Sequence, residues 1–219
     1  PLMSRMYFNN RVTFFKSFKG PLMQWYKVEP LTHQGGIQPK IGQARVLGGG
    51  SSLNGMIYAR GAPQDYDRWA ENGADGWGYR DVLPYFRKAE DNEVYSDDVH
   101  GQGGPLGVSN QSHTLPLTKA WVKACQEAGI PYNPDFNSGN LAGAGLYQLT
   151  TRNGRRCSSV DAYVRPAQRR GNLTVVTNKQ VVKIVVERGR AVGVQYLDNN
   201  RLVTMRAEQE VIISSGALG

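Results

Sequence analysis

The feature that most constrains this chain is a glycine-rich stretch at residues 42–67. Three consecutive glycines, residues 48–50, precede the short polar residues Ser51, Ser52 and Asn54, and three apolar residues follow. Glycine lets the backbone take positive φ and approach a ligand closely, so that N–H groups converge on an anion beside short side-chain donors. A plain turn is the alternative, whereas a Gly/Ser linker would not need the apolar residues that flank this stretch. The pattern favours a ligand cradle.

Length and composition fit a globular protein of one large domain or two small ones. The chain has 219 residues, of which 40% are hydrophobic and 20% charged. No apolar run approaches the ~18 to 20 residues of a membrane-spanning helix, so we expect no transmembrane segment. The chain opens at Pro1 without a signal-peptide pattern. We therefore expect the true N-terminus of the protein to be missing. A cytoplasmic or membrane-peripheral location is favoured, and no targeting signal in the sequence decides between the two.

Charge and cysteine spacing argue against two classes of function. A net charge of +8 is compatible with an anionic cofactor, an anionic surface or nucleic acid. The basic residues are scattered, their tightest groups lie at residues 152–156 and 169–170, and no RNP motif, zinc finger or basic helical stripe accompanies them. Nucleic acid is therefore disfavoured as a partner. Cys125 and Cys157 lack metal-ligand spacing, so we expect two reduced thiols and no metal site.

A helix is predicted at residues 63–71, where Pro63 opens the segment and Asp65 and Asp67 suit the N-terminal end of the helix dipole. Hydrophobic periodicity predicts two more helices, at residues 80–90 and 117–128. A short strand is predicted at residues 106–109, and the aromatic-rich residues 1–40 are expected to be irregular chain. The apolar stripes consist of Val82, Leu83, Phe86 and Ala89 in the second helix and of Leu117, Trp121, Ala124 and Ala128 in the third.

The last third predicts an antiparallel β-meander. Strands are expected at residues 173–177, 181–187, 191–197 and 201–207, separated by short turns. Residues 210–214 are expected to form a further strand, in which the apolar run of residues 211–213 passes into small residues, as is typical of a central parallel strand at its ligand-facing end. A helix should follow that strand, but the sequence stops, so we expect the chain to be a fragment.

Several motifs resemble one family in the family's own order. Residues 44–67, ARVLGGGSSLNGMIYARGAPQDYD, resemble the first signature of the glucose–methanol–choline (GMC) flavin oxidoreductases, and are most similar to the choline-dehydrogenase-like alcohol dehydrogenases. Further segments that resemble the family are GWGYRDVLPYFRKAED, GGPLGV, YNPDFN, RNGRRCSS, NLTVVT and AVGVQY. Residues 215–219 resemble the opening of the second signature. The resemblance covers nearly the whole chain.

This resemblance implies an FAD site, because the glycine-rich loop of similar proteins lies along the diphosphate and the flavin. The matching positions here are Val46, Gly48, Gly49, Ser51, Asn54, Gly55, Met56 and Ile57. Bare backbone and short donors suit a diphosphate, and Met56 and Ile57 would flank the isoalloxazine. The resemblance also implies the Val181 backbone at the adenine, with Ser215 nearby. Some relatives attach FAD covalently through a His just before the motif Asn. Leu53 occupies that place, so we expect non-covalent FAD.

For the fold class we expect a mixed α/β protein with pieces of two domains. Residues 1–90 and 172–219 would form part of a Rossmann-like FAD-binding domain, the latter with the antiparallel meander and the parallel strand. Residues 91–171 would form part of an inserted α+β substrate domain. Similar enzymes carry a strand-GxGxxG-helix unit near their N-terminus, and it is absent from this sequence.

The implied activity is oxidation of the CH–OH group of a choline-type or primary alcohol, with hydride transfer to flavin N5 and a quinone or oxygen as electron acceptor. The family's catalytic His and its partner lie beyond the second signature, so we assign no catalytic residue in this chain. His33, His100 and His113 match neither position and are expected to be surface residues in loops. A flavin-containing hydroxynitrile lyase and an inactive fragment without FAD are the alternatives, and the oligomeric state stays open.

Overall fold

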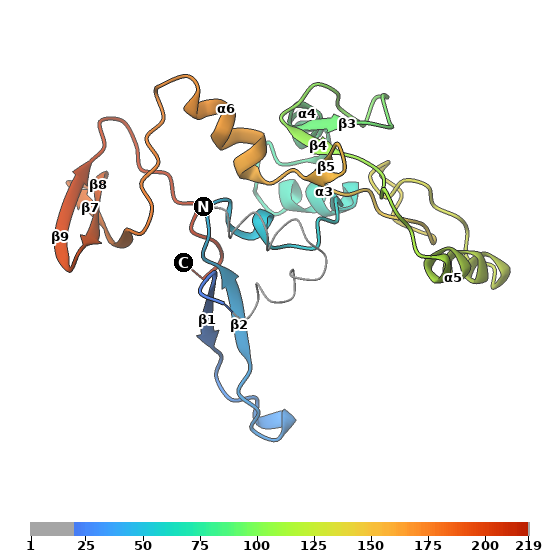
Figure 1. Cartoon of the computed structure of the whole chain (residues 1–219), viewed down its shortest axis with the longest axis horizontal. Helices are drawn as coiled ribbons and strands as arrows, with labels where there is room; N and C mark the ends of the chain where they lie inside the picture. Colours follow the sequence, from blue (N-terminus) through green and yellow to red (C-terminus); the bar gives the residue numbers. More distant parts are fainter. Residues whose placement is uncertain (1–19, 219) are drawn as a thin grey trace. The chain divides into compact units, whose positions relative to one another are not determined.

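The computed structural model describes residues 20–218, which separate into two compact units on either side of residue 170 (Figure 1). Each unit is described by itself. The aromatic residues at the start of the chain lie outside the described residues; they are Tyr7, Phe8, Phe14, Phe15 and Phe18.

The first unit opens with a two-stranded antiparallel hairpin rather than the irregular chain that the sequence suggested. Strand β1 (Met23–Lys27) pairs with β2 (Lys40–Ala44), and the 3-10 turn η1 (Thr32–Gln34) lies in the loop between them. A Cβ on Gly42 would lie 2.9 Å from the Trp25 ring, so this glycine leaves room for the indole across the ladder. The two strands pair across a loop of residues 28–39, and this pairing, rather than a periodic pattern within either segment, makes them strands.

Two of the predicted helices are confirmed at nearly their predicted bounds. Helix α3 (Pro63–Glu71) starts with proline at its first position, and Asp65 Oδ2 accepts a hydrogen bond from the Ala62 N–H at 2.9 Å. Helix α4 (Tyr79–Ala89) is half-buried along the predicted apolar stripe and at Tyr79, and exposed elsewhere on its surface. The two helices pack through aromatic rings, with the Tyr66 and Phe86 centroids 5.7 Å apart.

Helix α5 (Pro116–Glu127) exists as predicted, but its apolar stripe does not face the protein. Leu117 is 80% exposed and Trp121 is 71% exposed, whereas Val122 and Cys125 are half-buried. The remaining elements of this unit are β3 (Glu90–Asn92), β4 (Leu106–Val108), β5 (Thr151–Arg152), β6 (Arg155–Arg156), η3 (Val160–Val164) and α6 (Arg165–Gln168). Strands β3 and β4 are parallel, and β5 and β6 form a tight hairpin.

The core of the first unit is unusually polar. Its buried hydrophobic residues are Leu53, Val108, Phe136, Cys157 and Ala162. Buried polar residues accompany them, and they include Arg60, Glu90, Asn92, His100, Asn133, Asn137 and Gln148. Both cysteines are free thiols, as expected. Because buried polar groups need partners, hydrogen bonds rather than apolar contacts alone hold this unit together.

The second unit contains the predicted meander. Strands β7 (Gln180–Glu187), β8 (Arg190–Asp198) and β9 (Arg201–Arg206) are antiparallel and lie in that order. Both connections are two-residue turns with positive φ at each residue, as in type I′ hairpins. The strands predicted at residues 173–177 and 210–214 are wrong, since neither segment is a strand. A strand needs a neighbour to pair with, and neither finds one among the described residues.

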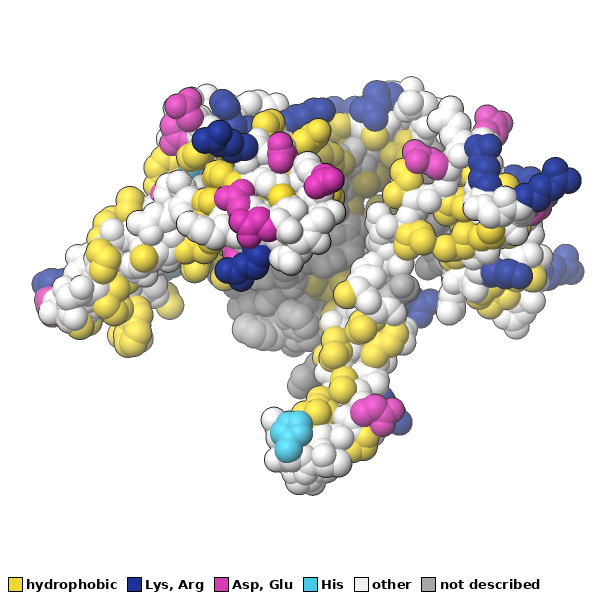
Figure 2. Space-filling view, turned by 180° about the vertical axis from the view of Figure 1, so that it is seen from behind, with side chains coloured by type: hydrophobic (Ala, Val, Ile, Leu, Met, Phe, Trp, Pro, Cys, Tyr) yellow, Lys and Arg dark blue, Asp and Glu magenta, His cyan; other side chains and the backbone are white. Residues whose placement is uncertain are grey.

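The described residues are thus a mixed α/β arrangement of small sheets and helices. Large hydrophobic side chains stay exposed over much of the surface and form the yellow patches of Figure 2. Examples with more than half of their area exposed are Tyr85, Leu117, Trp121, Ile212 and Ile213. Exposed apolar patches of this kind commonly mark surfaces that bind other groups. Within residues 20–218, no helix is long and apolar enough to cross a membrane.

Candidate functional site

The glycine-rich loop folds as a tight turn that leads into one turn of 3-10 helix, η2 (Gly49–Ser52). Gly48 and Gly49 have φ of +89° and +53°, a region that favours glycine. A Cβ on Gly48 would lie 2.5 Å from Ser52 Oγ and 2.8 Å from Val160 Cγ2, so a larger residue cannot fit without moving its neighbours. Gly48 is therefore required both by backbone conformation and by close packing, and Gly49 by backbone conformation.

The next glycines face open space instead. A Cβ on Gly49, Gly50 or Gly55 would meet no atom within 4 Å. Among the described residues, no backbone oxygen accepts a hydrogen bond from the N–H of Gly50 or Gly55. A bare backbone surface with unused donors is what a diphosphate group needs for close approach. The loop therefore fits the phosphate part of a dinucleotide such as FAD.

The two serine hydroxyls of the loop brace it from within. Ser51 Oγ donates to Gly48 O at 2.6 Å and accepts from Ser159 N at 3.0 Å. Ser52 Oγ donates to Leu47 O at 2.9 Å, and Ser52 is buried. The sequence suggested that both would be donors to a ligand, whereas here both hydroxyls donate to carbonyls of the loop itself. Their observed role is to hold the turn in shape.

The segment that would flank the flavin has a strained backbone. Met56 has φ of +66°, which is rare for a residue with a side chain, and the Asn54 Oδ1 accepts its N–H at 3.1 Å. The Met56 carbonyl accepts the Thr150 N–H at 2.8 Å, and Ile57 forms a β-bridge with Leu149. Strain of this kind, about 1–3 kcal/mol, concentrates at functional sites where the surroundings enforce it.

The other predicted FAD residues occupy different places. Val46 lies at the start of the loop, where its carbonyl accepts the Gly49 N–H at 2.8 Å. Val181 belongs to β7 of the second unit, is 56% exposed and pairs with Tyr196 next to a shift in the strand register. Ser215 lies in the irregular chain after the meander. The roles of Val181 and Ser215 at the adenine stay predictions.

The structure adds two loop contacts that the sequence did not suggest. Arg156 and Ser159 both hydrogen-bond to the glycine-rich loop, although they follow it by about a hundred residues. The sequence marked Arg156 only as part of a basic group. A basic residue next to a Cys-Ser-Ser run carries no local signal of such a contact, because its partners are distant in sequence.

A buried ionic network holds the segment that follows the loop. Arg60 Nη2 lies 2.5 Å from Glu90 Oε2, and His100 Nδ1 lies 3.0 Å from Glu90 Oε1. His100 Nε2 lies 2.9 Å from Asp135 Oδ2. The side chains of Arg60, Glu90 and His100 are at most 3% exposed. The expectation of a surface His100 is therefore wrong, because its buried ring binds two carboxylates, Glu90 and Asp135, that lie elsewhere in the sequence.

Hydrogen bonding overcomes the cost of burying these charges. Burial alone would lower the pKa of His100, but its hydrogen bonds to Glu90 and Asp135 raise this pKa above the ordinary value. Burial alone would raise the pKa of Glu90, but hydrogen bonds from His100 and Asn92 hold this pKa below its usual range. Both ring nitrogens of His100 are engaged, so its role is structural. His33 and His113 are exposed, as expected.

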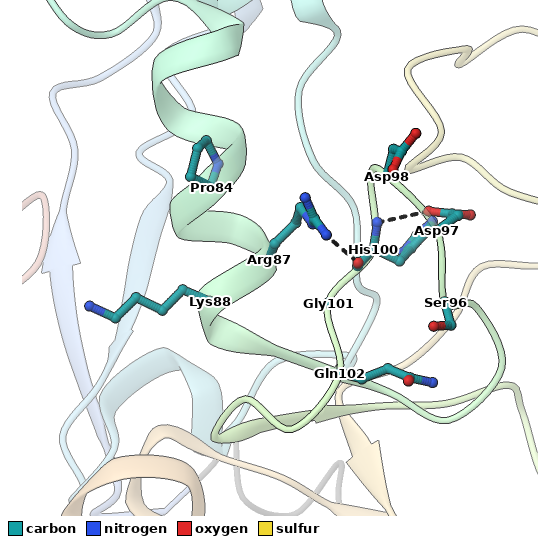
Figure 3. A pocket seen from close by; sticks show the side chains of 9 residues that line it. All are labelled: Pro84, Arg87, Lys88, Ser96, Asp97, Asp98, His100, Gly101 and Gln102. Carbon is teal, nitrogen blue, oxygen red and sulfur yellow. Dashed lines mark hydrogen bonds between the residues drawn. The ribbon is translucent and has the colours of Figure 1, made fainter.

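An open depression of about 630 Å³ is lined by His100 of this network together with residues of α4 and of the 96–102 loop (Figure 3). Arg87 Nε donates to His100 O at 3.4 Å, and the His100 N–H donates to Asp97 Oδ1 at 2.9 Å. Lys88 and Asp98 also line the depression, so positive and negative side chains face the same space. This mixture favours no single ligand charge. Within residues 20–218, no group of three or more His, Cys, Asp or Glu side chains could hold a metal ion.

Comparison with known proteins identifies the family. The model of the GMC oxidoreductase family matches residues 36–219. The chain therefore belongs to the GMC oxidoreductases, a family whose members bind FAD. It is 41% identical over 193 residues to the oxygen-dependent choline dehydrogenase of Brucella anthropi, and these cover 88% of this chain and 35% of that protein. It is also 41% identical over 206 residues to the oxygen-dependent choline dehydrogenase of Pseudomonas putida, covering 91% of this chain and 36% of that protein.

Solved structures of other oxidases share the fold of this chain. Pyridoxine 4-oxidase from Mesorbium loti is similar with a TM-score of 0.86 and 29% identity over 93% of this chain and 40% of its own. Formate oxidase from Aspergillus oryzae has a TM-score of 0.84 at 21% identity, over 96% of this chain and 38% of its own, and supports the fold alone. The chain spans about a third of the length of the curated relatives it matches.

Proposed function

We propose that the full-length protein containing this chain is an FAD-dependent oxidoreductase that acts on the CH–OH group of a choline-type or other primary alcohol. FAD is held non-covalently, because Leu53 stands where some relatives have the attaching His. The glycine-rich loop is one wall of the FAD site. The observation that carries this proposal is the open backbone surface at Gly49, Gly50 and Gly55 within a chain of this family.

The chain's own residues would bind and orient the cofactor. The N–H groups of the loop would receive the diphosphate, and the strained Met56 with the exposed Ile57 would contact the flavin. The Val181 backbone and Ser215 would lie toward the adenine. When bound, FAD supplies a hydride acceptor at N5. The overall reaction removes a proton and a hydride from the alcohol and passes two electrons to oxygen or a quinone. We assign the base to a residue outside this chain.

Anaerobic mixing of the purified full-length protein with choline tests the proposal. The visible flavin absorption should bleach with choline and should return when oxygen or a quinone is added. Ethanol, benzyl alcohol and glucose, tested in parallel, define the substrate class. The similarity to oxygen-dependent choline dehydrogenases favours choline over these alcohols.

Two results would contradict the proposal. Flavin absorption that stays unchanged with every alcohol would rule out the redox activity. Cleavage of a cyanohydrin without any bleaching would instead identify a hydroxynitrile lyase. For the isolated chain of 219 residues we expect weak or no FAD binding, because it spans about a third of the length of its curated relatives. Tight stoichiometric flavin on the isolated chain would overturn that expectation.

A further inference from the structure

Arg156 makes three hydrogen bonds to the glycine-rich loop. Its Nη1 donates to Ser51 O at 3.0 Å and to Asn54 Oδ1 at 2.8 Å, and its Nη2 donates to Asn54 O at 2.9 Å. A planar guanidinium can hold two neighbouring acceptors in a fixed geometry, which a single ammonium group cannot. Arg156 therefore fixes both the main chain and one side chain of the loop.

The β5–β6 hairpin aims Arg156 at the loop. The hairpin turns at Asn153 and Gly154, whose φ values of +52° and +69° suit a two-residue I′ turn. Successive side chains of a strand point to opposite faces, so Arg155 and Arg156 point in opposite directions. Arg155 is exposed, and its side chain makes no hydrogen bond or ion pair with another described residue. The two neighbouring arginines thus form a natural pair of test and control.

Ser159 holds the other side of the same loop. Its N–H donates to Ser51 Oγ at 3.0 Å, and its Oγ donates to Gly48 O at 3.3 Å. The neighbouring Ser158 is bound to the start of the following helix, where its Oγ donates to Asp161 Oδ2 at 2.6 Å. The segment 156–159 is therefore anchored before it reaches the loop, and it contacts the loop at both ends.

These contacts decide how the Asn54 amide is presented. Asn54 Oδ1 accepts hydrogen bonds from Arg156 Nη1 and from the Met56 N–H. An amide with its oxygen engaged on one side directs its NH₂ group to the other side. Within residues 20–218, the Asn54 NH₂ donates to no acceptor, and the side chain is exposed. The Asn54 amide therefore presents a free donor, and its orientation depends on Arg156.

We propose that Arg156 and Ser159 are positioning residues for the cofactor site, which hold the glycine-rich loop in its binding shape and turn the Asn54 NH₂ toward the flavin. This inference rests on the proposed FAD-dependent function. Arg156 acts through Asn54 and the loop backbone rather than by touching the cofactor. Its guanidinium also brings a permanent positive charge to a loop that receives a diphosphate.

The test compares Arg156→Met with Arg155→Met in the full-length protein after removal and titration of FAD. Each variant loses one positive charge from the same hairpin. We expect the FAD dissociation constant of Arg156→Met to rise about tenfold or more, which corresponds to the loss of one charge-assisted hydrogen bond. The dissociation constant of Arg155→Met should stay unchanged. Arg156→Lys, which keeps the charge but not the paired donors, should recover only part of the affinity.

A double-mutant cycle separates positioning from general loss of structure. If Arg156 acts through Asn54, the effects of Arg156→Met and Asn54→Ala on the FAD dissociation constant will not add. The visible circular dichroism of bound flavin should change in Arg156→Met and stay like wild type in Arg155→Met. If Arg156→Met prevents folding, Ser159→Ala is tested in its place. This variant removes only a hydroxyl and should weaken FAD binding several-fold.

The outcomes separate this inference from the proposed function. Wild-type FAD binding together with an unaffected Arg156→Met would overturn the positioning role and leave the proposed function standing. Additive effects in the double-mutant cycle would also overturn it. A wild-type full-length protein that binds no FAD would overturn both.

Discussion

Removing the carboxylate of Glu90 should destabilise the first unit more than any surface substitution. Glu90 is fully buried and accepts hydrogen bonds from Arg60 Nη2 at 2.5 Å, Asn92 Nδ2 at 2.7 Å and the Gly101 N–H at 3.0 Å, and it faces His100. Glu90→Ala leaves the Arg60 guanidinium, only 3% exposed, without its counter-charge. The substitution therefore leaves a buried charge uncompensated.

The expected loss follows from that geometry. Breaking a buried ion pair from one side costs about 3–5 kcal/mol of the free energy of unfolding. For a domain of this size, that corresponds to a fall in melting temperature of about 6–20 °C. Glu90→Gln keeps the shape and one acceptor oxygen, so it should lose less, about 1–3 kcal/mol.

Urea unfolding followed by tryptophan fluorescence measures these values in the purified protein. Glu71→Ala is the control, because Glu71 is exposed at the end of α3 and should change the free energy of unfolding by less than about 0.5 kcal/mol. A Glu90→Ala variant as stable as Glu71→Ala would refute the reasoning, since it would mean that the buried network contributes nothing.

Three further predictions concern the same unit. The pKa of His100 is raised, so the stability that His100 contributes should be complete below about pH 6.5 and fall as pH rises through the folded-state pKa. The pKa of Glu90 is lowered, so the stability that Glu90 contributes should be present above about pH 4.5 and fall as pH drops through the folded-state pKa. Unfolding free energies measured across pH for wild type and His100→Gln check this, and a pH-independent difference would contradict it. Gly101→Ala would push a methyl group into a backbone carbonyl of α4, so its melting temperature should fall by several degrees. A thiol reagent should label Cys125 quickly and the buried Cys157 only after unfolding, and equal rates would disprove the assigned burial.

Local patterns predicted the elements whose signals lie within them. Helix α3 begins at a proline, and two-residue turns separate the meander strands, so the bounds of these elements follow from nearby residues. The strands expected at residues 173–177 and 210–214 failed for the opposite reason. An apolar run becomes a strand only when a neighbouring strand completes its hydrogen bonds, and that information is not local.

The candidate site shows the same division. The glycine spacing predicted an exposed backbone for ligand approach, and Gly49, Gly50 and Gly55 do face open space. The contacts that shape the loop could not be predicted, because Arg156 lies 102 residues from Asn54. Likewise, the burial of His100 depends on carboxylates 10 and 35 residues away. Long-range hydrogen bonds leave no periodic trace in the sequence.

The flavin content of the purified full-length protein tests the central claim most directly. The account predicts stoichiometric FAD that acid or heat releases into solution, and little FAD in a Gly48→Ala variant, whose added Cβ would displace Ser52 and Val160. Wild-type protein without flavin, or Gly48→Ala protein that retains it fully, would contradict the assignment of this loop to the cofactor. FAD that stays bound to the unfolded chain would contradict non-covalent attachment.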